Sequence, residues 1–446
     1  MKSRANGLAS KAKTLFEYGY ISDQFEDNHC IKVCAPSFLY LEQLCLSQDE
    51  EASQVLRLCR YNGYKVLKVV NYVGVLQRPY GEHIEVLPKI ARSALQSNSE
   101  EIQEDAETRS RKVLLKMLRH LKQFRHIETA ESQVSACKMH LMEIFIRQFL
   151  NSVNVLIKRG LRSDYVRREE NQAFLKGKLL VAQQLKHNAI QQHRFYVEYD
   201  EYLQDRPINR LIHTALETVS GITKLNAHQK LARELMFAFE GVPFSRNIAQ
   251  DFQSIKMDRG MNYYQTPLAW TRLILEGHSP LSMQGKSNAI SLMFPMEAVF
   301  EAYVGSILKK RAADGFVVKE QVRSQSLVVH QGNKWFRLKP DFAVVQNNNI
   351  KLVMDTKWKL LDEFLSDGSS KYGLSQADFY QMFAYAHKYL KGEGDLVLIY
   401  PKSDKFTSPI EAPFKFGEKL KLWVVPFDLD KDELLVPEGL GISFQQ

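Results

Sequence analysis

The feature that most constrains the fold is a predicted β-hairpin in the last third of the chain. Residues 350–357 form a mainly apolar strand pattern, and Gln346 followed by three asparagines at residues 347–349 comes directly before it. Asparagine tolerates the backbone conformations of tight turns, so the segment that starts at Asp341 is expected to pair with residues 350–357. Side chains alternate along a strand, which places Asp355 and Lys357 on one face and lets Asp341 approach them.

Two converging carboxylates suit a hard divalent cation. Asp341 and Asp355 offer oxygen ligands and leave coordination positions for water and a phosphate oxygen. Such a cation would stabilise an attacked phosphodiester and lower the pKa of a bound water, while Lys357 could orient that water or neutralise the phosphate. An isolated Asp-x-Lys is usually an ordinary exposed pair. Here the hairpin-sized gap, the apolar strand and a helix on either side agree with a metal-dependent site.

Composition bounds the class of protein without identifying a function. The chain has 446 residues, too many for one ordinary hydrophobic core, so we expect two or three domains. Its 60 Lys and Arg against 51 Asp and Glu give a net charge of +9, which is compatible with a polyanionic partner. No apolar run approaches the ~18 residues of a membrane span, and no signal core is present, so we expect a cytoplasmic protein with no membrane association.

The cysteines predict reduced thiols. Five cysteines in a chain without a secretory signal do not indicate a disulfide framework. Four lie close together in sequence, but their spacing matches no paired zinc signature, so ordinary buried thiols are favoured over structural zinc for Cys30, Cys34, Cys45 and Cys59.

The N-terminal part of the chain is predicted to be rich in β-structure. Short β-branched and aromatic runs at residues 64–70 and 83–87 are separated by turn residues, so residues 1–95 are expected to form a β-rich domain. Residues 91–110 are polar and show no apolar periodicity, which indicates a linker or an exposed loop.

The middle region, residues 96–280, is predicted to be mainly helical. The apolar spacing favours helices from Lys112 to about Gly160 and at residues 209–219 and 228–239. A polar, basic segment at residues 162–194 interrupts them.

The last region, residues 281–446, is predicted to be an α/β domain. The pattern indicates a helix, then strands, a second helix with Ser375 as a possible N-cap, and a buried strand, at residues 294–310, 316–345, 350–358, 375–390 and 396–400. The predicted fold class is therefore multidomain α+β.

The C-terminal arrangement resembles the PD-(D/E)xK nuclease superfamily. Pro340-Asp341 and Asp355-Thr356-Lys357 match its two core motifs. The resemblance implies a restriction-endonuclease-like fold, with a glutamate on the preceding helix that joins the metal or its water network. Glu301 matches that position best, and Glu297 lies one turn earlier on the same face. It also implies a functional Gln and Tyr on the following helix, which match Gln381 and Tyr385 at helical spacing.

A narrower resemblance is to the McrC family of McrBC-type, modification-dependent restriction systems. It rests on residues 296–304, Leu338 to Asp341 and Asp355 to Lys359, together with upstream segments at residues 84–90, 174–179 and 199–201 followed by Asn209. The first thirty residues match nothing in this family. The resemblance implies an Mg²⁺- or Mn²⁺-dependent endonuclease subunit with Asp341, Asp355 and Glu301 as metal ligands.

The same resemblance implies a separate partner, a McrB-like AAA+ GTPase hexamer that binds GTP and recognises modified, methylcytosine-containing double-stranded DNA. This chain would dock on that motor and stimulate it. Its one P-loop-like fragment, Gly285-Lys286-Ser287, has Pro280 where the motif requires glycine, so we expect no nucleotide site there. The basic segment, including Lys176, Lys178, Lys186, His187 and Arg194, could contact the motor or DNA, or be a solvated surface.

Two other functions remain open at this point. The chain could be a non-catalytic adaptor that activates the GTPase, with the nuclease fold as a scaffold. It could also be a stand-alone DNA nuclease that needs no motor. An intact acid-acid-lysine set argues against the adaptor, because converging charged groups are costly to keep without a purpose.

Overall fold

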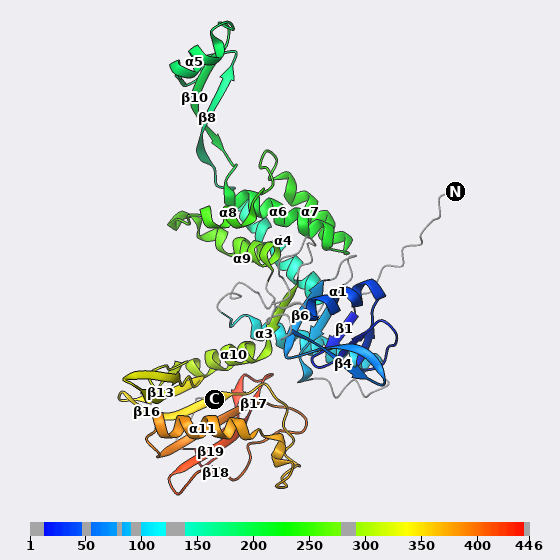
Figure 1. Cartoon of the computed structure of the whole chain (residues 1–446), viewed down its shortest axis with the longest axis vertical. Helices are drawn as coiled ribbons and strands as arrows, with labels where there is room; N and C mark the ends of the chain where they lie inside the picture. The colour runs from blue at the N-terminus through cyan, green and yellow to red at the C-terminus, as the bar shows by residue number, and fades with distance from the viewer. Residues whose placement is uncertain are drawn as a thin grey trace, which may run out of the picture. The chain divides into compact units, whose positions relative to one another are not determined.

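The computed structural model describes residues 13–46, 55–77, 83–90, 100–121, 139–277 and 291–440 (Figure 1). The chain forms two compact units, one from Met1–His140 with Ser279–Gln446 and the other from Leu141–His278. Both contain helices and strands, so the expected mixed α/β multidomain class is confirmed. The finer division at residues 95 and 280 stays a prediction. Across these described ranges, no helix combines the length and apolar character that crossing a bilayer requires.

Two four-stranded sheets form the N-terminal part of the first unit. Buried residues of both sheets and of α1 (Ala35–Leu46) make one apolar cluster. β6 and β11 approach so closely that a Cβ at Gly74 would lie 1.9 Å from Leu292 O, which explains the glycine. The strands predicted at residues 64–70 and 83–87 are confirmed. The sheet orders are β1 (Lys13–Phe16), β7 (His83–Leu87), β6 (Tyr72–Gln77), β11 (Leu292–Pro295), and β3 (Cys30–Lys32), β2 (Tyr20–Ser22), β5 (Tyr64–Val69), β4 (Leu56–Tyr61).

The linker predicted at residues 91–110 is wrong in its second half, where α3 (Glu100–Leu118) begins; residues 91–99 lie outside the described residues. The buried face of this helix includes Ala106, Ser110 and Arg111. Two of these side chains are polar, so the apolar periodicity that identifies a helix is absent there. Arg111 can be buried because a carboxylate partner from a distant strand meets it.

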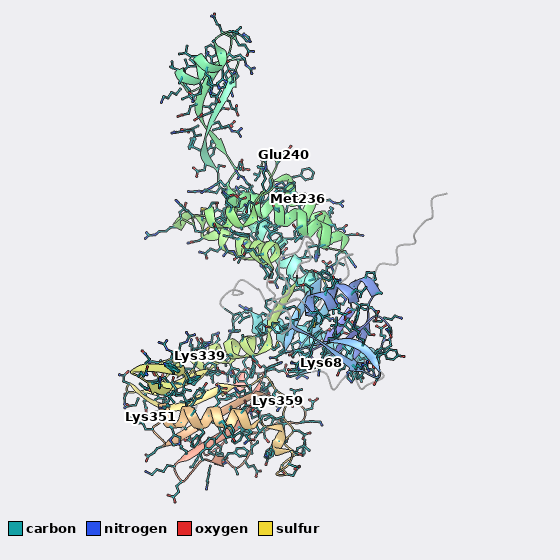
Figure 2. The ribbon with its side chains drawn as sticks, in the orientation of Figure 1. Lys68, Met236, Glu240, Lys339, Lys351 and Lys359 are labelled. Atoms are coloured by element: carbon teal, nitrogen blue, oxygen red, sulfur yellow. The ribbon has the colours of Figure 1, made fainter. Side chains whose placement is uncertain are left out.

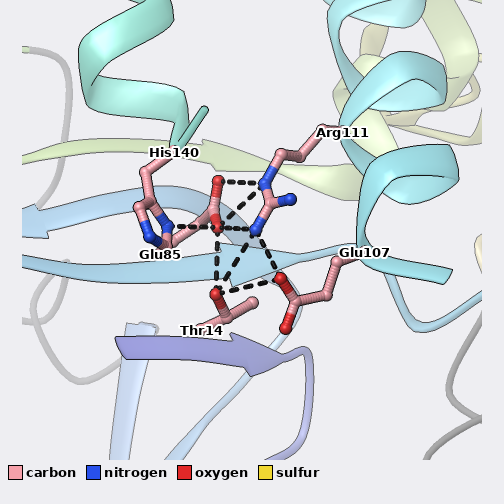
Figure 3. A network of polar contacts seen from close by, with 5 residues as sticks. All are labelled: Thr14, Glu85, Glu107, Arg111 and His140. Carbon is pink, nitrogen blue, oxygen red and sulfur yellow. Dashed lines mark hydrogen bonds and ion pairs between the residues drawn. The ribbon is translucent and has the colours of Figure 1, made fainter. Parts of the chain in front are cut away.

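That partner is Glu85 of β7, and the two form a buried ion pair (Figure 3). Arg111 Nη2 lies 2.7 Å from Glu85 Oε2 and 2.6 Å from Glu107 Oε2. Thr14 Oγ1 donates to Glu85 Oε2 over 3.2 Å, and His140 Nδ1 lies 3.2 Å from the same oxygen. Burial opposes the ionised form of Glu85, but the hydrogen bonds and charges of His140 and Arg111 outweigh it and lower its pKa to about 2. The network ties β1, β7 and α3 together.

A seven-stranded mixed sheet forms the C-terminal part of the first unit. Its central strands β16, β17 and β19 are parallel, and the flanking pairs are antiparallel. Buried apolar runs make these strands the core of the layer. The predicted hairpin is confirmed, with Asn347 and Asn348 at φ 49° and 65° in its turn. The order is β12 (Val317–Glu320), β15 (Phe342–Gln346), β16 (Asn349–Thr356), β17 (Gly394–Pro401), β19 (Leu420–Asp428), β18 (Phe414–Lys415), with β20 (Glu433–Leu434) on β19.

Two helices contact β16, namely α10 (Met296–Lys310) and α11 (Gln376–Tyr389). The helix predicted from residue 294 begins two residues later because β11 pairs with β6 up to Pro295. Ser375 does occupy the N-cap position of α11, but its side chain makes no capping hydrogen bond. A short turn, η4 (Lys371–Gly373), precedes α11, and the separate hairpin β13 (Ser326–His330) and β14 (Asn333–Arg337) precedes β15.

Helices make up most of the second unit. The predicted helices at residues 209–219 and 228–239 are confirmed by α6 and α7, and Gly160 ends α4 at φ 90°. Figure 2 labels Met236 near the end of α7 and Glu240 just beyond it. The helices are α4 (Leu141–Arg159), α6 (Pro207–Ile222), α7 (Asn226–Phe237), α8 (Ile248–Ser254), η3 (Arg259–Tyr264) and α9 (Gln265–Glu276).

The polar segment between α4 and α6 contains strands that the sequence patterns did not indicate. β8 (Asp164–Gln172) and β10 (Phe195–Leu203) pair along their whole length, with β9 (Lys178–Leu179) and α5 (Val181–Asn188) between them. Charged residues such as Arg168 and Glu201, 2.7 Å apart, pair across the two strands. The charged sequence of β8 therefore lacks the apolar alternation that indicates a strand, although burial does alternate in β10, where Val197 and Tyr199 are buried.

The described cysteines are free thiols, in agreement with the expected reduced state. Cys30 is buried as expected. Cys34 is exposed, so the expectation of a buried thiol is wrong at that position.

Candidate active site

The β15–β16 hairpin brings Asp341 against the end of β16. Phe342 pairs with Met354, so the residue before Phe342 faces the residues after Met354. Asp341 Oδ2 accepts hydrogen bonds from Thr356 N at 2.7 Å and from Thr356 Oγ1 at 2.6 Å. The predicted approach of Asp341 to the Asp355-Thr356-Lys357 segment is thus present in the structure.

Asp355 is the most buried carboxylate of the site, with 2% of its surface exposed. The apolar run that precedes it is fully buried in β16, and Asp355 itself pairs with Leu398 of β17. Burial, and then the negative charge of Asp341, raise the pKa of Asp355 to about 7. Burial also raises the pKa of Asp341, although the hydrogen bonds from Thr356 oppose this rise. Both carboxylates therefore lie where a nearby cation would favour their ionised forms.

Lys357 supplies the positive charge of this group. Its Nζ lies 2.6 Å from Asp355 Oδ2 and donates a hydrogen bond to Gln381 Oε1 over 2.9 Å. Burial opposes the charged form of Lys357, but the charges of Asp355, Asp378 and Asp341 outweigh it and raise its pKa. The ammonium group is thus held in place and charged.

Gln381 and Tyr385 share one face of α11, as their spacing predicts. Gln381 Nε2 donates to the Tyr385 hydroxyl at 2.8 Å, and that hydroxyl donates to Lys339 O at 3.0 Å. A chain of hydrogen bonds therefore runs from Lys357 through α11 to the backbone beside Pro340. Figure 2 labels Lys339 at this point.

Glu301 of α10 lies at the border of the site. Gln321 Nε2 donates to Glu301 Oε1 over 2.8 Å, and burial together with the charge of Asp341 raises the pKa of Glu301. Glu297, the alternative one turn earlier, is exposed, and its charge acts on Tyr18. The charge of Asp341 acts on Glu301, which favours Glu301 over Glu297 as the glutamate of the site.

Asp378 is a further carboxylate of the site that the sequence motifs did not indicate. Its Oδ1 lies 3.8 Å from Lys357 Nζ, and the Tyr400 hydroxyl donates to Asp378 Oδ2 over 3.3 Å. The negative charge of Asp378 contributes to the raised pKa of Asp355. Asp378 precedes Gln381 by three residues on α11, and this helical spacing was the signal that could have found it.

Two residues from the N-terminal part of the chain also reach this region. Lys89 Nζ donates to Trp358 O at 2.9 Å, and the Trp358 indole donates to Glu17 Oε2 at 2.9 Å. Trp358 follows Lys357 directly, so these contacts anchor the chain immediately beyond the site. Lys89 belongs to the segment at residues 84–90 on which the family resemblance partly rests.

The donor chemistry fits a hard divalent cation. Asp355 is a buried and Asp341 a partly buried carboxylate, both with raised pKa values, and a bound cation would relieve their unfavourable proximity. Within the described ranges, no group of three or more His, Cys, Asp or Glu residues forms a ready-made metal cluster. Mg²⁺ needs no such cluster, because it is commonly held by one or two carboxylates with water and phosphate in the other positions.

Comparison with known proteins identifies one family and a similar fold. The model of the McrBC 5-methylcytosine restriction system component family matches residues 67–401. A chain of the refined half-complex from the tetradecameric assembly of Thermococcus gammatolerans McrB AAA+ hexamers with bound McrC is similar with a TM-score of 0.66 and 19% identity, over 94% of each chain. A chain of the cryo-EM structure of the Thermococcus gammatolerans McrBC complex has a TM-score of 0.46 and 18% identity, over 67% of this chain and 87% of that one. No curated protein matches.

Proposed function

The chain belongs to the McrBC 5-methylcytosine restriction system component family, and from this membership we propose that it is the DNA-cleaving subunit of such a system. The observation that carries the proposal is the group formed by Asp341, Asp355 and Lys357 at the end of one buried strand. We further propose that residues 281–446 have the PD-(D/E)xK nuclease fold, since a mixed sheet whose strand β16 contacts both α10 and α11 presents this motif.

In the proposed reaction, Asp341 and Asp355 would hold a divalent cation, Mg²⁺ or Mn²⁺, and Glu301 would join them as a ligand or through the water network of the metal. The cation, when bound, stabilises negative charge on the attacked phosphodiester and lowers the pKa of a water. Lys357, charged and fixed between Asp355 and Gln381, places its ammonium group beside that phosphate. Gln381 and Tyr385 keep Lys357 in position through hydrogen bonds.

The proposed partner is a McrB-like AAA+ GTPase hexamer. A chain in an assembly of McrB AAA+ hexamers with bound McrC shares the fold of this chain over 94% of its length, which supports a similar assembly here. GTP and the choice of modified, methylcytosine-containing DNA would belong to that partner. The fragment Gly285-Lys286-Ser287, which lacks the first glycine of a P-loop, lies outside the described residues. We place the complex in the cytoplasm, where DNA is accessible to it.

We propose the segment at residues 164–203 as a docking element for the motor. It contains the basic residues already named, and Lys176 stacks its ammonium group on the Tyr199 ring at 3.9 Å. Several large apolar side chains are exposed on the same segment: Tyr165, Phe174, Leu175, Val181, Leu185 and Ile190. Exposed apolar side chains of this density are typical of interaction surfaces.

The experiment that tests the function compares Asp355→Ala with wild type in the presence of the motor, GTP and Mg²⁺. The expected result is loss of DNA cleavage with retained stimulation of GTP hydrolysis. The matched control is Asp314→Ala, an exposed aspartate of the same region, which should leave both activities unchanged. Unchanged cleavage by Asp355→Ala would favour the adaptor, and robust cleavage by the chain alone without nucleotide would favour a stand-alone nuclease.

A further inference from the structure

The chain makes an excursion from the C-terminal sheet directly beside the proposed active site. Glu320 at the end of β12 pairs with Phe342 at the start of β15. The chain therefore leaves the sheet after Glu320 and re-enters it at Phe342. A tight turn would suffice to join two paired antiparallel strands. Instead, residues 321–341 intervene, and β13 and β14 form a hairpin of their own within them. We call residues 321–340 the β13–β14 arm (Figure 1, yellow).

The arm exposes large apolar side chains on both strands. Leu327, Val328 and Val329 of β13 and Trp335 and Phe336 of β14 are all exposed, with Phe336 at 70%. These residues make no core with the seven-stranded sheet. Solvent-exposed aromatic and branched residues on a protruding hairpin indicate a binding surface rather than a structural need.

Phe336 also has an unusual backbone conformation, with φ at 54°. Bulky residues rarely adopt positive φ because the side chain meets the backbone. A strained conformation of this kind persists where the surrounding structure imposes it and is concentrated at functional positions. At Phe336 the conformation interrupts the regular ladder between Ser326–Arg337 and Val328–Trp335, and the ring remains in solvent.

The charge of the arm has one sign. Residues 321–340 contain no Asp or Glu, and they contain four cationic residues that are all exposed: Arg323, Lys334, Arg337 and Lys339. Within the described residues, Glu320, which directly precedes the arm, pairs with Lys309, and none of these four cations forms an ion pair. The arm is therefore apolar and aromatic at its strands and positively charged around them.

The base of the arm is fixed to the helix that positions Lys357. The Tyr389 hydroxyl of α11 lies 2.8 Å from Val322 O and 2.9 Å from Leu338 O, so the two carbonyls on either side of the arm share its single proton. Leu338 N donates to Gln325 O at 3.0 Å, which closes the base of the hairpin. The arm is thus a braced projection whose last residues lead into Asp341.

The reach of the arm follows from chain geometry. Phe336 precedes Asp341 by five residues, and an extended chain spans at most about 3.5 Å per residue, or about 18 Å in total. Successive phosphates of one DNA strand are spaced by about 3.4 Å along the helix axis. The Phe336 ring can therefore contact DNA no farther than about five nucleotides from a phosphate held at Asp341.

We propose that the β13–β14 arm binds duplex DNA next to the cleaved phosphate, with its cations on the backbone and its exposed rings in a groove. This inference rests on the proposed function, because it places DNA at Asp341. A two-stranded ribbon fits the major groove, and apolar contacts with base edges are a known means of reading it. The absence of acidic residues from the arm's sequence matches the uniform negative charge of the duplex.

A second copy of this chain fits the arm less well. A two-fold symmetric interface places the same patch on both partners. Four cations of one arm would then face four cations of the other, with no acidic residue between residues 321 and 340 to compensate them. DNA meets the same surface with opposite charge.

The test is equilibrium binding of a fluorescent 30-base-pair duplex by the full-length chain in EDTA, where cleavage cannot occur. We expect measurable binding by wild type and roughly tenfold weaker binding by Trp335→Ala/Phe336→Ala, the loss typical of removing an aromatic contact to a base. Phe336→Gly should also weaken binding, and glycine suits the positive φ, so this variant keeps the fold. The matched control is Phe237→Ala, a 77% exposed phenylalanine of the second unit, which should bind as wild type does.

A charge variant gives an independent readout. Lys334→Gln/Arg337→Gln should weaken binding and reduce the slope of log affinity against log salt by about two, one for each phosphate contact removed. Wild-type chain that does not bind the duplex, or ring and charge variants that bind as wild type does, would overturn the inference. A change in sedimentation mass of the DNA-free chain caused by Phe336→Gly would also overturn it, because the arm would then be a self-association surface.

These outcomes can be distinguished from a failure of the proposed nuclease function. Binding through the arm without any Mg²⁺-dependent cleavage in the assembled complex would contradict the nuclease assignment and leave the DNA contact standing. Cleavage that depends on Asp355 but not on the arm would support the nuclease assignment and contradict the DNA contact.

Discussion

Lys357 Nζ lies 2.6 Å from Asp355 Oδ2, at the end of a strand whose preceding apolar residues are fully buried. A charged pair at such a position is costly in a folded protein unless other groups complete its interactions. Gln381 satisfies the ammonium group from one side, and the proposed cation would satisfy the carboxylate from the other. We therefore expect the stability of the protein to depend on pH and on a divalent cation.

The first prediction concerns Asp355. Its pKa is raised from 3.8 to about 7, so between about pH 4 and 7 the folded protein holds a proton that the unfolded chain has released. The metal-free protein should therefore lose stability as pH rises through this interval. Mg²⁺ binds the deprotonated form, so its stabilising effect should grow with pH. Melting temperatures in EDTA and in Mg²⁺ at about pH 5 and 8 measure both effects.

Asp355→Asn should flatten both pH dependences, while Asp314→Asn, the exposed control, should not. An Mg²⁺ stabilisation equal at the two pH values in wild type would contradict the assigned ligand.

The second prediction concerns the positioning of Lys357. Tyr385→Phe keeps the buried ring and removes the hydroxyl that accepts from Gln381 and donates to Lys339 O. We expect the cleavage rate to fall by about 10- to 100-fold, as is typical when the support of a catalytic site is removed, with DNA affinity unchanged. Single-turnover cleavage and duplex binding measured on the same preparation separate the two quantities.

Tyr380→Phe, an exposed tyrosine on the same helix, is the matched control and should keep the wild-type rate. Equal rates for Tyr385→Phe and wild type would show that the hydrogen-bond chain does not position Lys357.

The third prediction concerns the buried Glu85–Arg111 pair. Glu85→Gln removes the buried partner of Arg111 and leaves only the more exposed Glu107, so we expect a loss of up to about 3–5 kcal/mol in the free energy of unfolding. The pKa of Glu85 is lowered from 4.5 to about 2, so the contribution of its ionised form is complete above about pH 4.5 and is lost as pH falls towards 2. Urea unfolding at neutral pH measures the first effect, and acid unfolding measures the second.

Glu26→Gln breaks the more exposed Lys13–Glu26 pair and should change the unfolding free energy by no more than about 1 kcal/mol. A Glu85→Gln variant as stable as wild type would mean that the pair adds nothing to the fold.

The fourth prediction concerns the segment at residues 164–203. Ile190 is 95% exposed just after the end of α5, and the exposed Leu185 lies within that helix, five residues earlier. If these side chains enter an apolar surface of the motor, Leu185→Asp/Ile190→Asp should reduce the stimulation of GTP hydrolysis by at least about tenfold, through loss of buried contacts. A titration of the motor with each variant measures this effect.

Phe364→Asp places the same charge at an exposed apolar position of the first unit and should stimulate the motor normally. Normal stimulation of GTP hydrolysis by the double variant would show that this segment is not part of the interface with the motor.

Local patterns predicted the parts of the molecule that local forces determine. The hairpin that presents Asp341 and Asp355 follows from an apolar strand and an asparagine turn, and the facing of Gln381 and Tyr385 follows from helical spacing. The start of α3 could not be predicted, because its buried face includes the polar Ser110 and Arg111, and the burial of Arg111 depends on its pairing with the distant Glu85.

Other contacts depend on residues far apart in the sequence. The anchoring of Trp358 by Glu17 and Lys89 joins positions separated by more than 250 residues, and no local spacing indicates it. The strands β8 and β10 escaped detection because charged side chains pair across them and neither face forms a continuous apolar core. The position of Asp378 was within reach of helical spacing, but its contact with Lys357 required the structure.

The most direct measurement of the central claim is single-turnover DNA cleavage by the complex assembled with Lys357→Ala, with GTP hydrolysis recorded in the same reaction. If Lys357 places positive charge on the attacked phosphate, cleavage should fall by roughly 100- to 1,000-fold while GTP hydrolysis stays within about twofold of wild type. Cleavage by Lys357→Ala at the wild-type rate would contradict the account.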